Sequence, residues 1–299
     1  MAGRWSGGRL VAYHAGCRCA KRGDRLLESC RGTPRHTVRH FGEDLSVRIN
    51  TAKQKMQRGE VSFGYAIGLG SIVAAEAMAN CGIDHILLDR QHGSWGEDST
   101  IAALIAMHGG SAIPMARVSR NDYTMIGRLL DEGCMGIIVP MVHTREDAKA
   151  AADACRLPPI GTRSWGWGRA TIYGADYPDT VDEQIFVAVQ IESRQAVENV
   201  EAILSTPGVD GCWTGPGDMA LSMGVDPRKA DDSDEHARAL EKIVQACKNT
   251  GKIPGIAAGG IEDGLRRASQ GFQYIICGSD SGFMKAGAAA GLKALGVTK

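Results

Sequence analysis

The sequence predicts an α/β protein, a (β/α)8 TIM barrel that follows an N-terminal extension. From residue 61 onward, short apolar runs of strand length alternate with segments that have helical periodicity. Such alternation is typical of βαβ units and a parallel sheet, and eight such units close into a barrel. The chain of 299 residues is long enough for one barrel of ~250 residues.

Each expected element follows from its own stretch of sequence. The expected strands are 61–68, 85–89, 112–118, 136–141, 186–192, 211–215, 253–258 and 274–278. The expected helices include 71–82, 123–133, 145–156, 194–205, 235–251, 264–271 and 283–296, several of which end in glycine, a usual helix stop. The competing fold, a doubly wound open sheet, would normally carry Gly-x-Gly-x-x-Gly after its first strand. Residues 64–71 do not follow that pattern, which favours the barrel.

Residues 1–45 differ from the rest of the chain, because they are rich in arginine and lack sustained periodicity. Targeting peptides are poor in acidic residues, so Asp24 and Glu28 argue against one. A disordered extension and a start site assigned too early are the alternatives. We therefore divide the chain into an extension, 1–45, and a barrel domain, 46–299.

The composition excludes several classes of protein. The formal net charge is zero, so no basic surplus indicates nucleic-acid binding. No apolar run approaches the ~20 residues of a membrane span. The nine cysteines are scattered and odd in number, which favours free thiols in a reducing compartment such as the cytoplasm. No pair of Cys-x-x-Cys motifs indicates a zinc site.

The longest irregular segment, 157–185, carries two tryptophans, Trp165 and Trp167, together with Arg163 and Arg169. Structureless segments of this length are commonly functional or disordered. Aromatic and guanidinium groups suit a lid or an interface, so we expect Trp167 to contribute to substrate binding.

Polar residues gather at the ends of the expected strands. Asp89, Gln91 and His92 follow the second strand, and Arg117 lies near the end of the third. Barrel active sites lie at the carboxyl ends of the strands. Taken singly, His92 is compatible with a surface position and Arg117 with a structural ion pair. Their gathering at one end of the barrel favours an active site.

The fifth and sixth strands bring two carboxylates toward the same end. Side chains alternate along a strand, so Gln190 and Glu192 face the barrel interior. Asp218 follows the turn formed by Gly215, Pro216 and Gly217. As an isolated residue it would be read as a helix cap. Two neighbouring carboxylates repel unless a cation joins them or one is protonated, and oxygen ligands suit Mg²⁺ or Mn²⁺. We therefore expect Glu192 and Asp218 to be metal ligands, with the N–H groups of Gly217 and Asp218 available to a substrate carboxylate.

Four separated motifs resemble the HpcH/HpaI aldolase family, and the similarity extends over about residues 48–296. They are the segments 89–98, 114–118, 158–170 and 189–224. The resemblance implies a (β/α)8 barrel and a metal-dependent pyruvate aldolase with Mg²⁺ or Mn²⁺, and Co²⁺ as a further candidate. It also implies a homohexamer, a trimer of dimers that exchange their last helix, acting on a small 2-oxo acid.

The resemblance also assigns roles to individual residues. Glu192 and Asp218 match the metal ligands, and His92 matches the catalytic histidine, with Asp89 orienting it. Arg117 matches the arginine that contacts the substrate's keto oxygen. The pyruvate-binding positions correspond to Gln190, Gly215, Pro216, Gly217 and Asp218. The better-known aldolases have glutamate where this chain has Gln91.

Three alternative functions stay open at this point. Oxaloacetate decarboxylation of the macrophomate synthase-like kind would use the same enolate and metal. A phosphate-binding isomerase would use the glycine-rich segments 257–264 and 277–282, which follow the last two strands. A non-catalytic barrel that binds a small acid is compatible with Gln91 in place of glutamate. No lysine lies at an expected strand end between residues 61 and 282, which disfavours an imine-forming aldolase.

Overall fold

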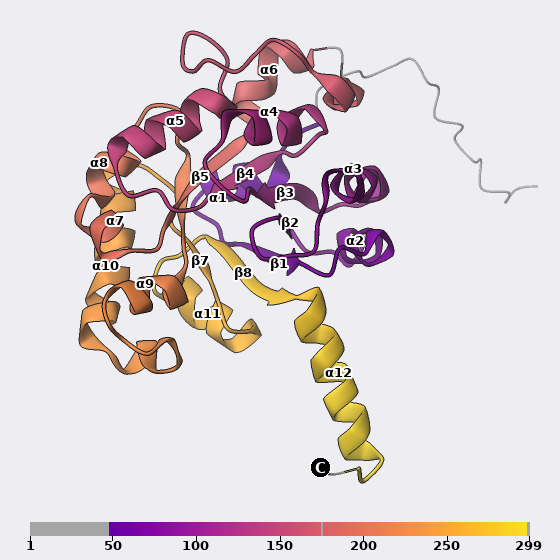
Figure 1. Cartoon of the computed structure of the whole chain (residues 1–299), viewed down its shortest axis with the longest axis vertical. Helices are drawn as coiled ribbons and strands as arrows, with labels where there is room; N and C mark the ends of the chain where they lie inside the picture. The colour runs from indigo at the N-terminus through magenta and orange to yellow at the C-terminus, as the bar shows by residue number, and fades with distance from the viewer. Residues whose placement is uncertain (1–47, 175, 298–299) are drawn as a thin grey trace, which may run out of the picture. The chain divides into compact units, whose positions relative to one another are not determined.

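The computed structural model describes residues 48–174 and 176–297, so the expected extension 1–45 lies outside the described residues. Eight parallel strands form a closed barrel in which each strand pairs with the next and β8 pairs with β1 (Figure 1). The strands are β1 (Ser62–Ile67), β2 (His85–Asp89), β3 (Ile113–Arg117), β4 (Gly136–Val139), β5 (Phe186–Ile191), β6 (Gly211–Thr214), β7 (Gly255–Ala257) and β8 (Tyr274–Ser279). The predicted (β/α)8 barrel is confirmed.

Helices follow the strands and surround the barrel. The α-helices are α1 (Thr51–Gln57), α2 (Ile72–Ala79), α3 (Glu97–Ala106), α4 (Tyr123–Asp131), α5 (Arg145–Cys155), α6 (Tyr177–Gln184), α7 (Arg194–Glu198), α8 (Val200–Leu204), α9 (Pro216–Ser222), α10 (Asp234–Thr250), α11 (Ile261–Ser269) and α12 (Asp280–Ala294). The 3₁₀ helices are η1 (Met107–Gly109), η2 (Gly168–Tyr173) and η3 (Pro227–Asp232). None of the helices in the described part of the chain is long and apolar enough to cross a bilayer.

Side-chain caps fix where the helices after the strands begin. Ser71, Asp122, Thr144, Ser193 and Ser279 each accept a hydrogen bond from the backbone N–H three residues further on. Such caps satisfy N–H groups that the helix itself leaves unpaired, and each contributes about 1 kcal/mol. Because these helix starts follow the strand ends closely, the loops at the carboxyl end of the barrel are short.

An aromatic layer fills the barrel at the amino ends of its strands. Tyr274 stacks on His85 at 4.6 Å between ring centroids and lies 5.2 Å from the ring of Phe186. All three are first residues of their strands and are fully buried. Burial lowers the pKa of His85 to about 3, so the imidazole is neutral in the folded protein. This layer closes the end of the barrel away from the expected site.

The segment 157–185 is not irregular, because it contains η2 and α6. Arg163 pairs with Asp131 at 2.9 Å, and the hydroxyl of Tyr173 donates to the carbonyl of Gly133 at 2.5 Å. Asp131 is the last residue of α4 and Gly133 lies between α4 and β4, so both partners are near the amino ends of the strands. Within one chain the expectation of a lid over the site is therefore wrong, since the segment packs at the opposite end.

Gly64 on β1 gives a test of the packing inside the barrel. A Cβ atom at this position would lie 2.2 Å from Nε2 of His85. Overpacking of this kind costs roughly 1–3 kcal/mol, so Gly64→Ala is expected to lower the free energy of unfolding by about that amount. Thermal and urea unfolding monitored by circular dichroism would measure the change.

The matched control is Gly127→Ala in α4, where a Cβ atom meets none of the described atoms within 4 Å. Alanine is a better helix former by up to about 1 kcal/mol, so this variant is expected to be as stable as the parent or more so. Equal stability of the two alanine variants would contradict the packing that we describe.

Candidate active site

The carboxyl ends of β2, β3 and β5 place polar side chains in the mouth of the barrel. Asp89 on β2 and Arg117 on β3 are register partners, and Gln190 on β5 is paired with Trp213 on β6. Glu192 follows β5 by one residue and keeps the inward orientation of Gln190, because the two side chains hydrogen-bond to each other. The gathering of these residues, predicted from strand periodicity, is present in the structure.

Asp89 and Arg117 form a two-pronged ion pair. Nε of Arg117 lies 2.9 Å from Oδ1 of Asp89, and Nη2 lies 2.5 Å from Oδ2. The guanidinium also lies over the ring of Trp213, 5.0 Å from its centroid. Burial acts to raise the pKa of Asp89, but the hydrogen bonds and charge of Arg117 outweigh it, and the pKa is lowered. Asp89 is therefore ionised and holds Arg117, which is 8% exposed, in one orientation.

His92 lies exposed in the loop after β2. The carboxylate of Asp89 accepts hydrogen bonds from the backbone N–H groups of Gln91 and His92, at 3.1 and 3.2 Å. Among the described residues, the His92 ring itself has no hydrogen-bond partner. The expectation that Asp89 orients this ring directly is not met, because both oxygens of Asp89 are engaged by Arg117 and by the loop backbone.

Glu192 is a buried carboxylate, 4% exposed. It accepts hydrogen bonds from the backbone N–H of Met141 at 2.7 Å and from the side-chain amide of Gln190. Burial raises the pKa of Glu192, the Met141 hydrogen bond opposes this, and the charge of Asp218 raises it further. Met141 has a φ of 57°, a strained conformation for a residue other than glycine. The backbone after β4 is thus bent so that its N–H reaches this carboxylate.

Asp218 lies near the start of α9, two residues after Pro216, and its side chain is exposed. The N-cap position belongs to Gly215, so the interpretation of Asp218 as a simple helix cap is wrong. A Cβ atom on Gly215 would lie 2.9 Å from Nε2 of Gln190 and 3.1 Å from Oε2 of Glu192. Glycine at 215 therefore lets the start of α9 pass close to Glu192.

The two carboxylates fit a divalent cation. Neither Glu192 nor Asp218 forms a salt bridge with any described residue, and the charge of Asp218 contributes to the raised pKa of Glu192. In the described part of the chain, the buried Oε1 atom of Gln190 beside them has no partner. An all-oxygen donor set suits Mg²⁺ or Mn²⁺. No cluster of three or more His, Cys, Asp or Glu residues occurs among the described residues, so two carboxylates leave positions for water and substrate oxygens.

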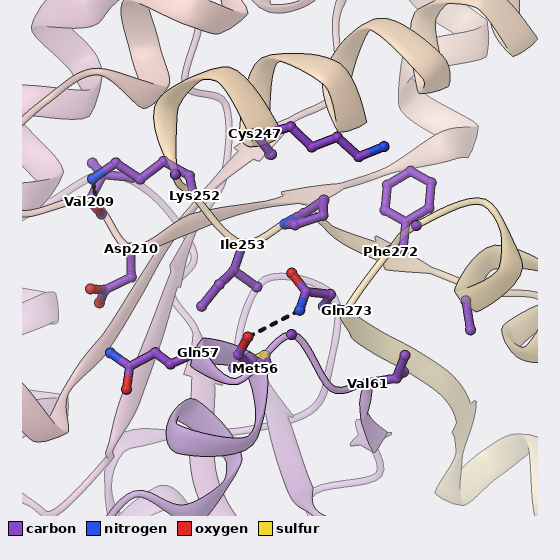
Figure 2. Close-up of a pocket in the computed structure, with 16 residues that line it drawn as sticks. Met56, Gln57, Val61, Val209, Asp210, Cys247, Lys252, Ile253, Phe272 and Gln273 are labelled. Carbon is purple, nitrogen blue, oxygen red and sulfur yellow. Dashed lines mark hydrogen bonds between the residues drawn. The ribbon is translucent and has the colours of Figure 1, made fainter.

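Two cavities lie at opposite ends of the barrel. One of about 470 Å³ opens at the mouth and is lined in part by Asp89, Arg117 and Trp213. The other, of about 580 Å³, lies between segments that precede β1, β6, β7 and β8, and its lining includes Asp210 and Lys252 (Figure 2). The described lining of this second cavity includes none of the expected site residues.

The structure does not bring Trp167 to the other expected residues. Its ring lies 5.7 Å from that of Tyr177 and 5.7 Å from the guanidinium of Arg163, beside the amino ends of the strands. Two residues at the mouth were not expected, Trp213 and Met141. The alternation along β6 could have identified Trp213 as inward-facing, whereas nothing in the sequence indicates the φ of Met141.

The chain is similar to several known proteins. A model of the family described as HpcH/HpaI aldolase/citrate lyase matches residues 68–286. The chain is 35% identical over 233 residues to a hydroxypyruvate/pyruvate aldolase of Chromohalobacter salexigens, covering 76% of this chain and 90% of that protein. It is 33% identical over 239 residues to a 5-keto-4-deoxy-D-glucarate aldolase of Shigella dysenteriae, covering 79% and 93%. A solved HpcH/HpaI aldolase/citrate lyase family protein from Burkholderia cenocepacia superposes with a TM-score of 0.76 at 30% identity, covering 82% and 99%.

Glu192→Gln is expected to raise the melting temperature of chelator-treated protein. The amide removes a buried charge that burial and Asp218 both disfavour, and it keeps an oxygen for the Met141 N–H. Differential scanning calorimetry in the presence of EDTA would measure the shift.

Glu76→Gln on α2 is the matched control, because it makes the same change at an exposed position and surface changes usually stay within about 0.5 kcal/mol. A lower melting temperature for Glu192→Gln than for the parent would contradict our description of Glu192 as a carboxylate that destabilises the metal-free fold.

Proposed function

The chain belongs to the HpcH/HpaI aldolase/citrate lyase family, and from this premise we propose that it is a divalent-metal-dependent pyruvate aldolase. It is a carbon–carbon lyase that cleaves or forms 4-hydroxy-2-oxo acids, giving pyruvate and an aldehyde. One observation carries the proposal: the carboxylates of Glu192 and Asp218 lie at the same barrel mouth as Arg117. Neither carboxylate forms a salt bridge with a described residue.

Glu192 and Asp218 would hold the cation, which we propose to be Mg²⁺ or Mn²⁺ with Co²⁺ as a further candidate. When bound, it supplies a Lewis acid for the 2-oxo acid. Arg117 supplies a fixed positive charge for the keto oxygen as negative charge develops there. Because Asp89 and the Trp213 ring hold the guanidinium, it does not need to reorganise during the reaction. The N–H groups of Gly217 and Asp218, in the first turn of α9, bind the substrate carboxylate.

His92 moves the proton on the substrate's 4-hydroxyl oxygen. In the cleavage direction this oxygen loses its proton and becomes the aldehyde carbonyl. The C3–C4 bond breaks, its electron pair passes to the enolate of pyruvate, and C3 then takes up a proton. The exposed position of His92 in a loop whose backbone is tied to Asp89 supports proton exchange with water at the mouth.

An imine mechanism has no support in the described part of the chain. Lys53 is a buried lysine, but its ammonium donates to the carbonyl of Ile185 and pairs with Asp210, both of which immediately precede strands. No lysine is among the described residues that line the cavity at the mouth. The enolate is therefore stabilised by charge rather than by a covalent bond to the protein.

We further propose a homo-oligomer, a hexamer built as a trimer of dimers, in the cytoplasm. Helix α12 leaves the barrel after β8 and runs away from the strands (Figure 1). The helix exposes Phe283, Met284 and Leu292, and Leu295 directly after it is also exposed; exposed apolar side chains gathered on one element commonly mark an interface. The described cysteines form no disulfide, which supports a reducing compartment.

Removal of divalent metal is expected to abolish cleavage of a 4-hydroxy-2-oxo acid. Exhaustive treatment with EDTA, followed by gel filtration and addition of Mg²⁺, Mn²⁺ or Co²⁺, should restore pyruvate release, measured with lactate dehydrogenase. Full activity of stringently metal-free protein would overturn the proposal.

His92→Ala is expected to lower kcat by roughly 10²–10⁴-fold, the usual contribution of a general acid–base group, with an unchanged melting temperature. Ser94→Ala, an exposed change in the same loop, is the matched control and should retain activity. Unchanged turnover of the His92 variant would remove this residue from the proton transfer.

A further inference from the structure

The cavity at the barrel mouth has two unlike sides. Glu192 and Asp218 belong to the side formed by β5 and β6, whereas the cavity of about 470 Å³ extends from Arg117 and Trp213 toward β1, β7 and β8. Its volume falls within the usual range of roughly 300–1,000 Å³ for small-molecule sites. If the 2-oxo acid lies between the carboxylate pair and Arg117, this cavity is the space beside C3, where the second carbon skeleton must lie.

Small and apolar side chains form most of the cavity wall. They are Ala66, Leu87, Ala257, Ala258, Ile261, Ile276, Cys277, Phe283 and Ala286. Arg117 and Asp89 are the charged residues among the described lining residues, and they neutralise each other in a two-pronged ion pair. The described wall therefore offers no unpaired cation to a substrate carboxylate or phosphate, which would lose its hydration without compensation.

Two carboxylates lie directly behind the wall: Asp280, which has no salt bridge among the described residues, and Asp263, which pairs with Arg266 and Arg267. Asp280 follows the lining residue Ser279, is 5% exposed, and accepts hydrogen bonds from the N–H groups of Gly68 and Leu69. Asp263 accepts a hydrogen bond from the N–H of the lining residue Gly259 at 2.8 Å. The N–H of Gly259 is thus already used by the protein. A phosphate in this loop would therefore have to displace the Asp263 carboxylate from that N–H.

Trp213 is a polar group in the wall that the protein leaves unpaired. The side chain is 4% exposed and lines the cavity, and among the described residues its indole N–H has no acceptor. A buried N–H without a partner has lost its hydration without compensation, which is unfavourable. An oxygen of a bound molecule that accepts from Trp213 would remove that cost, and it would lie beside Arg117, over which the indole is stacked.

We infer that this cavity binds the aldehyde half of the substrate and selects uncharged, mainly apolar aldehydes, with the Trp213 N–H donating to the aldehyde oxygen. This inference rests on the proposed pyruvate aldolase activity and names its second substrate. In the forming direction, C3 of the enolate attacks the aldehyde carbon, a C–C bond forms, and the carbonyl oxygen takes up the proton that completes the 4-hydroxyl group.

A matched pair of aldehydes tests the charge preference. Butanal and succinic semialdehyde have the same four-carbon chain and differ in whether it ends in a methyl group or a carboxylate. With pyruvate and Mg²⁺, we expect kcat/KM of the full-chain protein to be at least tenfold higher for butanal, measured by product mass. Equal values, or a preference for succinic semialdehyde, would overturn the inference.

Two variants test the wall itself. Trp213→Phe keeps an aromatic ring beneath Arg117 but removes the N–H, and it is expected to raise KM for butanal at least tenfold.

Ala257→Leu fills part of the cavity and is expected to lower kcat/KM for butanal more than for the smaller acetaldehyde. Ala150→Leu on α5 makes the same change at an exposed position and is the control. An unchanged KM in Trp213→Phe, or an equal effect of Ala257→Leu on both aldehydes, would contradict the assignment.

Exchange of the pyruvate methyl protons with deuterated water, followed by NMR without any aldehyde, separates this inference from the proposed function. Exchange together with a preference for the charged aldehyde would overturn the inference and leave pyruvate enolisation standing. Absence of exchange in the metal-loaded protein would overturn both.

Discussion

The carboxylate of Glu192 is held where burial disfavours its charge, and the rest of the barrel mouth is arranged around that constraint. Its oxygens are met by one backbone N–H and one side-chain amide, and the neighbouring carboxylate of Asp218 makes ionisation harder. A protein keeps such a group in place only when the surrounding fold is stable without it. The closed strand ladder and the aromatic layer around Tyr274 supply that rigidity at a distance from the site.

Asp89, Arg117 and Trp213 divide the mouth into two chemically different halves. The ion pair is internally neutral, so it presents an oriented guanidinium without adding net charge to the cavity beside it. Stacking on the indole further restricts Arg117. One half of the mouth is thereby suited to a chelated, negatively charged 2-oxo acid, and the other to a carbon chain that needs little hydration.

The parts of the fold set by local periodicity could be predicted from the sequence. The alternation of Ala188, Gln190 and Glu192 along β5 correctly oriented Glu192, because a strand has a fixed two-residue period. The two-residue period could not reveal that Asp89 bonds Arg117 and the loop backbone rather than the His92 ring, because the pairing of Asp89 with Arg117 depends on the register between β2 and β3. Within one chain, Trp167 lies apart from the other expected residues because a segment that follows a helix leads back to the amino end of the next strand, away from the mouth.

The two ends of the barrel show why stability and function can be separated in this fold. At the amino end, Arg163 pairs with Asp131, the hydroxyl of Tyr173 is bonded, and Lys53 is held by Asp210 and by the carbonyl of Ile185. At the carboxyl end, Oε1 of Gln190 and the indole N–H of Trp213 are buried without partners among the described residues, as are Nε2 of His85 and the hydroxyl of Tyr274 in the aromatic layer at the amino end. Unpaired polar atoms are costly wherever a protein tolerates them. The two atoms at the mouth differ from those at the amino end in lying beside a charge that burial disfavours, which is the arrangement expected when a cation and a substrate complete the interactions.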